Sequence, residues 1–231
     1  MIFQDRIHAG RVLANALSEY SGRSDVSVLA LPRGGVPVGF EVARFLKAPL
    51  DVFIVRKLGV PGHEELAMGA IASGGIMVLN EDVIRQAHIS SSSLEQTARR
   101  ERLELSRREQ AYRAGHAPVE VTDKVCILVD DGIATGASMQ AAAKAVRSMH
   151  PKLLVIAVPV ASPSVFRQFA KVADKVVCVM TPEDFNAVGA WYEHFEQTSD
   201  EEVAHYLNIG SFPAQENSRI TESDREFWLG P

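Results

Sequence analysis

The chain alternates short apolar runs with segments of helical periodicity, and this alternation restricts its fold more than any other feature. Apolar runs typical of buried strands lie at residues 26–31, 52–55, 125–129, 153–158 and 176–179. The intervening segments repeat apolar side chains at helical intervals, as Val38, Val42 and Phe45 do. Strands that alternate with helices form right-handed parallel units, so we predict an α/β fold with an open, mostly parallel five-stranded sheet and flanking helices.

The two ends of the chain lie outside this alternation. Apolar side chains recur at roughly helical intervals from Phe3 to Leu17, which predicts an amphipathic helix on the flank of the domain. After residue 179 the alternation stops, and residues 180–207 combine aromatic side chains with a short helical pattern. We therefore expect a core at 1–179, a small C-terminal hood at 180–207 and a polar tail at 208–231.

The segment between the second and third predicted strands is too long for a simple crossover, so we assign an insertion at about residues 58–118. It begins with a predicted loop at 59–65. Residues 66–73 and 76–79 flank two glycines and are typical of a β-hairpin. The insertion ends in a predicted long helix.

This long helix should run from Ser92 to Arg113, and Asn80 should cap a short helix before it. Arg and Glu recur along the long helix three and four residues apart. Because the glutamates offset most of the arginine charge, we interpret it as a solvated or subunit-packing helix rather than a nucleic-acid surface. A long, sparsely apolar helix also favours a homo-oligomer, most simply a homodimer.

Composition excludes several classes of function. The 231 residues carry a formal net charge of -5, which gives no general attraction to nucleic acid or anionic membranes. No apolar run is long enough to span a bilayer. Cys126 and Cys178 both lie in apolar runs, which is typical of buried thiols in a reducing compartment. We expect a cytoplasmic protein that acts on small molecules, without a membrane or nucleic-acid partner.

The strongest functional motif follows the third predicted strand. Asp130 and Asp131 end the strand, and a Gly/Thr/Ser loop then opens a helix. Ligands bind at this end of parallel strands, and backbone N–H groups at a helix start favour a phosphate. Two carboxylates instead suit the hydroxyl donors of a sugar, so the motif indicates a ribose 5-phosphate site. An acidic turn that only caps the helix is the alternative, but a cap needs neither two carboxylates nor two glycines.

The motif closely resembles the phosphoribosyl pyrophosphate motif of the type I phosphoribosyltransferases, and not a Walker loop or a dinucleotide fingerprint. The whole chain is similar to a bacterial group of phosphoribosyltransferases known from sequence. The resemblance implies that Asp130 and Asp131 bind the ribose hydroxyls, with Mg²⁺ nearby and the two aspartates as its ligands. It also implies that a loop binds the 5-phosphate: Ile133, Ala134, Thr135, Gly136, Ala137 and Ser138.

A second loop follows the first predicted strand, where the family places its pyrophosphate loop. Here it contains Arg33, Gly34 and Gly35. An arginine beside free backbone N–H groups suits pyrophosphate, although a turn that caps the next helix is the alternative. By the resemblance we expect a non-proline cis peptide bond around Arg33–Gly34. Arg56 and Lys57 match family positions that contact pyrophosphate, or are simply cations at a strand end.

The insertion and the hood match the family's catalytic loop and base-binding segment. His63, Glu64 and Glu65 are the clustered titratable residues of the insertion, and we select Glu64 for a catalytic role, a solvated loop being the alternative. Phe185 and Trp191 could stack on a planar base or belong to the core.

The resemblance implies a Mg²⁺-dependent enzyme of nucleotide metabolism that transfers ribose 5-phosphate to a nitrogenous base and releases pyrophosphate. Arg33 and Lys57 would stabilise the leaving pyrophosphate. Ala134 stands where the 6-oxopurine branch carries an aspartate, which disfavours that branch; the motif is more similar to the adenine or orotate branches. Two alternatives stay open. One is a regulator that senses phosphoribosyl pyrophosphate and binds nucleic acid or protein, and the other is a phosphohydrolase with a metal at the acidic pair.

Overall fold

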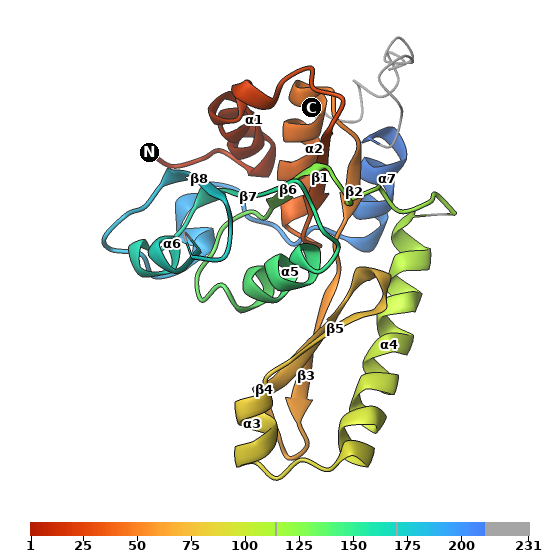
Figure 1. Ribbon diagram of the computed structural model, residues 1–231. Coiled ribbons are helices and arrows are strands. Elements are labelled where there is room, and N and C mark those ends of the chain that lie inside the picture. Colours follow the sequence, from red (N-terminus) through yellow and green to blue (C-terminus); the bar gives the residue numbers. More distant parts are fainter. Residues whose placement is uncertain (114, 170, 211–231) are drawn as a thin grey trace.

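The computed structural model describes residues 1–113, 115–169 and 171–210, and its centre is a five-stranded parallel sheet (Figure 1). The strands in spatial order are β2 (Leu50–Val52), β1 (Val26–Ala30), β6 (Val125–Val129), β7 (Leu153–Val160) and β8 (Lys175–Met180). Every neighbouring pair is parallel. The predicted α/β fold class is confirmed. Ala30 pairs with Val129, so the two central strands β1 and β6 end at the same level.

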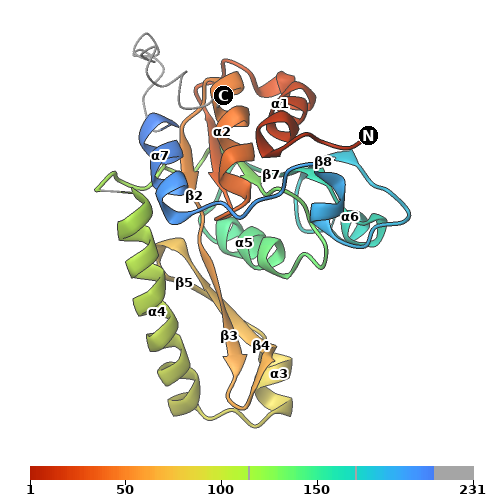
Figure 2. The same ribbon diagram turned by 180° about the vertical axis from the view of Figure 1, so that it is seen from behind.

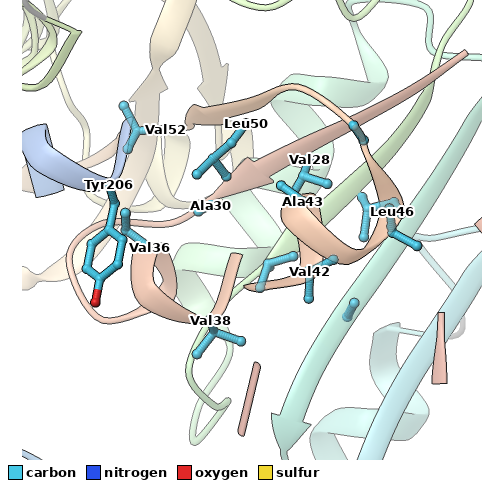
Figure 3. Close-up of a cluster of buried hydrophobic side chains, with 14 of the residues drawn as sticks. Val28, Ala30, Val36, Val38, Val42, Ala43, Leu46, Leu50, Val52 and Tyr206 are labelled. Atoms are coloured by element: carbon cyan, nitrogen blue, oxygen red, sulfur yellow. The ribbon is translucent and has the colours of Figure 1, made fainter. Parts of the chain in front are cut away.

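Helices cover both faces of this sheet. They are α1 (Arg6–Ala16), α2 (Gly35–Leu46), α5 (Ala137–Arg147), α6 (Pro163–Phe169) and α7 (Asp200–Gly210), with short 3-10 turns at Ser18–Tyr20 and Val188–Trp191. Helices α1, α2 and α7 pack on one face, where Val28 and Ala30 of β1 meet Val42 of α2 and Tyr206 of α7 (Figure 3). Helices α5 and α6 pack on the other face. The strands are therefore buried on both sides, which is why they appear in the sequence as continuous apolar runs.

The insertion forms an arm that projects from the core (Figures 1 and 2). It contains an antiparallel sheet of β3 (Val55–Val60), β4 (His63–Ala72) and β5 (Ile76–Leu79), a 3-10 turn (Ser73–Gly75), and helices α3 (Glu81–Gln86) and α4 (Ser91–Arg113). The arm has its own small apolar core, which includes Leu58, Met68 and Ala98.

Two sequence predictions for this region are wrong. The apolar run at 52–55 is not one strand, because β2 ends at Val52 and the chain leaves the core sheet to begin β3 at Val55. The predicted loop at 59–65 is mostly strand, with only a tight turn at Pro61 and Gly62. Antiparallel pairing of β3 with β4 outweighs the local turn signals of the glycines, and Gly62 supplies the positive φ that the turn requires.

The N-terminal helix is shorter than predicted. It begins at Arg6, after the N-cap Asp5, and Phe3 lies outside it in a parallel bridge with Tyr192. The first residues of the chain are thus paired with the predicted hood. Residues 208–210 of the predicted polar tail belong instead to α7, and the rest of that tail lies outside the described residues.

The arginines of α4 are extensively paired with acidic side chains. Arg102 pairs with Glu95, Arg107 and Arg108 pair with Glu104, and Arg113 pairs with Glu109 and Asp51. This pairing agrees with the expectation that the glutamates offset most of the arginine charge. None of the helices in the described part of the chain is long and apolar enough to cross a bilayer.

Candidate active site

Two loops meet at the carboxyl ends of β1 and β6, and they contact each other closely. A β-carbon built on Gly34 would lie 2.0 Å from Asp131 Oδ2, and one built on Gly35 would lie 2.8 Å from the Val129 carbonyl oxygen. The amide of Leu31 also donates to the Val129 carbonyl at 2.9 Å. The glycines are therefore required because the loops approach within the space of a side chain. The structure brings together the two motifs that the sequence singled out.

Each carboxylate of the acidic pair is held through one oxygen. Asp130 Oδ1 accepts a 2.9 Å hydrogen bond from the amide of Asp131, and Asp131 Oδ2 accepts one of 2.8 Å from Arg6 Nε. Among the described residues, no other residue donates to Asp130 Oδ2 or Asp131 Oδ1. Both residues are partly exposed, and neither oxygen is fully buried without a partner, a condition that in the described chain applies to Trp191 Nε1. The pair thus offers two acceptors on adjacent residues.

Burial disfavours ionisation of both carboxyl groups of this pair at once. Burial raises the pKa of Asp130 well above its usual value, and the neighbouring charge of Asp131 raises it further. Burial also raises the pKa of Asp131, while the guanidinium of Arg6 opposes that rise. A cation or a set of hydroxyl donors at the two open oxygens would favour the ionised pair.

The loop after the acidic pair has the features of an anion site. Gly136 adopts a positive φ of 78° and is the N-cap of α5, without a side-chain hydrogen bond at the cap. Thr135 and Ser138 are exposed beside it. The first turn of a helix leaves backbone N–H groups without intrahelical partners. This turn can therefore accept an anion on its backbone and two hydroxyls.

Ile133 is the exception within the predicted phosphate loop. Its amide donates to the Val160 carbonyl at 2.9 Å, and its side chain is buried in the core. It extends the sheet by a bridge to Ala161 and has no N–H free for a ligand. The open part of the loop therefore begins at Ala134.

Arg33 lies in the β1 loop and reaches the start of α7. Its Nη1 is 3.5 Å from Asp200 Oδ1, which also accepts a 2.8 Å hydrogen bond from the Tyr112 hydroxyl. Burial and this bond raise the pKa of Tyr112 to about 12, so it stays a donor. The non-proline cis peptide bond joins Pro32 to Arg33, one bond earlier than the sequence predicts.

In the described chain, the basic and acidic candidates of the insertion form their polar contacts within the arm and none with the acidic pair. Arg56 Nε and Nη2 both donate to Glu101 Oε2 of α4, at 3.0 and 2.7 Å. Lys57 is exposed on β3 and pairs with Glu65. Glu64 is exposed beside the turn between β3 and β4, at the end of the arm farthest from the parallel sheet (Figures 1 and 2).

The aromatic candidates of the hood are partly buried. Phe185 and Trp191 pack against an apolar cluster that includes Phe3 and Tyr192. Neither ring is fully exposed for stacking in this conformation, and the indole Nε1 of Trp191 is buried without a partner among the described residues. Their roles in binding a base stay predictions.

Two residues that the sequence did not single out hold the acidic pair. Arg6 bonds to the carboxylate of Asp131, and the Tyr192 hydroxyl donates a 2.5 Å hydrogen bond to the Asp131 carbonyl oxygen. Arg6 lies 125 residues before Asp131 in the chain. No local spacing relates these positions, so the sequence contains no signal for the contacts.

Comparisons with known proteins identify the family of this chain. A family model described as the phosphoribosyl transferase domain matches residues 3–194. The Mycobacterium tuberculosis protein named "Putative phosphoribosyl transferase Rv0571c" is 48% identical over 207 residues. That alignment covers 90% of this chain but 46% of the relative, so the chain spans about half the length of the curated relatives it matches. The crystal structure of TT1426 from Thermus thermophilus is 44% identical, with a TM-score of 0.82, and the match covers 92% of this chain and 100% of that one.

Proposed function

Because the chain belongs to the phosphoribosyl transferase family, we propose that it transfers ribose 5-phosphate from phosphoribosyl pyrophosphate to a nitrogenous base and releases pyrophosphate. The observation that carries this proposal is the acidic pair. Asp130 and Asp131 each keep one oxygen without a partner from another described residue, directly before a loop that can hold a phosphate.

The two ends of a ribose 5-phosphate fit this arrangement. Vicinal hydroxyls are donors, and Asp130 Oδ2 and Asp131 Oδ1 are acceptors on adjacent residues. The 5-phosphate would lie on the open loop from Ala134 to Ser138, where Gly136 with its positive φ turns the backbone into the first turn of α5. Sugar and phosphate are thereby assigned to neighbouring parts of one motif.

The β1 loop lies against the acidic pair and would take the pyrophosphate. Gly34 and Gly35 let this loop pack directly against Asp131 and Asp130, and Arg33 is close enough to Asp200 to be held in place. A guanidinium can donate two parallel hydrogen bonds to phosphate oxygens. As the bond from C1 to pyrophosphate lengthens, negative charge grows on the leaving group, and Arg33 would stabilise it there. The acidic pair would meanwhile hold the ribose, which becomes cationic.

Mg²⁺ fits this site as an ion held mainly by substrate oxygens. In the described part of the chain no three His, Cys, Asp or Glu side chains come together to hold a metal. The open oxygens of Asp130 and Asp131 are nevertheless hard ligands, and Mg²⁺ commonly uses one or two carboxylates with phosphates and water. When bound, Mg²⁺ would neutralise pyrophosphate charge.

The arm and the hood would complete the site around the acceptor base. Lys57 and Glu64 belong to the arm, so their proposed roles in stabilising pyrophosphate and in catalysis require the arm to approach the acidic pair. Arg56 would have to exchange Glu101 for a phosphate. Phe185 and Trp191 are the proposed aromatic contacts of the base.

The test is pyrophosphate release from phosphoribosyl pyrophosphate with Mg²⁺ against a panel of purine and pyrimidine bases. We expect turnover with at least one base and loss of at least 100-fold in the Asp130→Asn, Asp131→Asn double variant, since two charge-assisted contacts to the ribose disappear. Asp82→Asn, at an exposed position on α3, is the matched control and should keep wild-type activity.

Each other outcome contradicts the proposal. Wild-type turnover in the double variant would show that the acidic pair does not bind the ribose. Tight donor binding without turnover on any base would identify a sensor of the donor, and phosphate release without a base would identify a hydrolase.

A further inference from the structure

Arg6 connects three segments that are distant in the sequence. Its Nε donates to Asp131 Oδ2 at 2.8 Å, and its Nη1 donates to the Glu196 carbonyl at 2.6 Å. The guanidinium carbon lies 3.9 Å from the centre of the Phe195 ring. The start of α1, the acidic motif and the hood therefore converge on one guanidinium.

The contact with Asp131 is shielded from solvent. The side chains of Arg6 and Asp131 are 12% and 14% exposed. Charges in such surroundings interact more strongly than at the surface, and the aromatic face and the carbonyl restrict the guanidinium to one orientation. Arg6 Nε therefore fixes the position of Asp131 Oδ2.

Fixing Oδ2 also fixes the other oxygen of the same carboxylate. Asp131 Oδ1 accepts no hydrogen bond from another described residue, and the Asp131 side chain is partly exposed. The positive charge of Arg6 further reduces repulsion between Asp131 and Asp130. Both effects prepare the pair to receive hydroxyl donors without a rearrangement at the moment of binding.

We propose that Arg6 is a positioning residue for the ribose: it holds Asp131 through Oδ2 so that Oδ1 faces a sugar hydroxyl. This inference rests on the proposed function of the same site. It assigns a role in sugar recognition to the start of α1 and to Phe195, which keeps the guanidinium in place. The phosphate loop is not part of this contact.

The experiment compares two probes by isothermal titration with Mg²⁺ present: ribose 5-phosphate, which needs the acidic pair, and inorganic phosphate, which needs only the loop. We expect Arg6→Gln to weaken ribose 5-phosphate binding about tenfold, since a charge-assisted hydrogen bond then no longer holds Asp131. Phosphate binding should be unchanged. Arg6→Lys keeps a charged donor and should recover part of the loss.

Two further variants make the comparison decisive. Arg11→Gln changes the same residue type on the same helix, where the side chain is 61% exposed and pairs with Glu41, and it should bind both probes as the wild type does. Phe195→Leu removes the ring beneath the guanidinium and should weaken ribose 5-phosphate binding about threefold. Because Phe195 is 36% exposed, this variant decides the question even where Arg6→Gln does not fold.

The outcomes separate this inference from the proposed function. A wild-type protein that does not bind ribose 5-phosphate would refute the proposed donor site itself. Wild-type binding that is unchanged in both Arg6→Gln and Phe195→Leu would refute the role of Arg6 alone. Tighter binding in Arg6→Gln would show that Arg6 blocks the carboxylate, and equal losses for both probes would show a purely structural role.

Discussion

Gly34 faces the carboxylate of Asp131 so closely that a β-carbon on the glycine would lie 2.0 Å from Asp131 Oδ2 and 3.2 Å from Arg6 Nε. The glycine is therefore the point where the β1 loop, the acidic motif and the first helix meet. No side chain fits there unless the ion pair moves.

Replacement of this glycine, Gly34→Ala, should displace Asp131 and weaken binding of the sugar phosphate at least tenfold. Overpacking of this kind also costs about 1–3 kcal/mol of folding free energy. Titration with ribose 5-phosphate and urea unfolding measure the two effects. The control is Gly62→Ala at the turn of the arm, where φ is 79° and no atom lies within 4 Å of the added carbon. It should lose about 1 kcal/mol of stability and bind the sugar phosphate normally; equal binding in both variants would contradict the assigned contact.

The hydroxyl of Tyr192 should stabilise the acidic loop. It donates to the Asp131 carbonyl at 2.5 Å, and Tyr192 is 6% exposed. Tyr192→Phe leaves this carbonyl without its donor, so we expect a loss of about 1–3 kcal/mol in urea unfolding. Tyr20→Phe is the matched control, because Tyr20 is also buried but its hydroxyl makes no hydrogen bond within the described chain. A loss of similar size in both variants would assign the effect to the ring environment instead.

The ion pair between Asp51 and Arg113 should anchor the end of the arm to the core sheet. Arg113 Nε donates to Asp51 Oδ1 at 2.9 Å, and the two side chains are 11% and 6% exposed. Arg113→Met would leave a buried carboxylate unpaired, which costs about 3–5 kcal/mol. Arg102→Met breaks an exposed pair with Glu95 on the same helix and should cost less than 1 kcal/mol. Equal midpoints of urea unfolding for the two variants would refute this anchoring role.

Burial and a raised pKa should protect both thiols from reaction with a thiol reagent. Burial raises the pKa of Cys126 to about 12, and its thiol donates to the Val121 carbonyl. Burial raises the pKa of Cys178 to about 11. At pH 8 we expect little labelling of the native protein by a thiol reagent and labelling of two thiols after unfolding in urea.

The raised pKa values of the two thiols also determine how the free energy of unfolding changes with pH. Between the ordinary thiol value and the raised one, the folded chain keeps a proton that the unfolded chain has lost, so stability falls as pH rises from about 9 to 12. The slope is about 1.4 kcal/mol per pH unit for each group. Cys126→Ala should lose this part of the slope in urea unfolding at several pH values. An identical slope in the variant would mean that Cys126 titrates normally.

Much of the core could be predicted from the sequence because its determinants are local. Strand β6 is found at the predicted residues, and β7 and β8 differ only at their ends, since buried parallel strands require continuous apolar runs. The cap of α3 is also local, and the amide of Val83 donates to Asn80 Oδ1 as expected. Sequence signals of this kind extend over a few residues, and they predict the features that depend on those residues alone.

The boundary of the arm could not be predicted in this way. Residues 52–55 are apolar, but Val52 ends one strand and Val55 begins another in a different sheet. An apolar pattern shows that residues are buried, but it does not show which sheet they join. The pairing of β3 with β4 decides that question, and it involves residues that the sequence placed in a loop.

The sequence by itself determined the acidic pair, the glycine loops and the parallel sheet that brings them to one edge. Only the tertiary structure decided how the pair is held, because Arg6, Phe195 and Tyr192 come from the two ends of the described chain. It also placed Glu64 at the start of β4, beside the turn that lies at the end of the arm farthest from the parallel sheet (Figure 1). A motif encodes chemistry through neighbouring residues, whereas burial and charge pairing depend on contacts between segments that no spacing along the chain records.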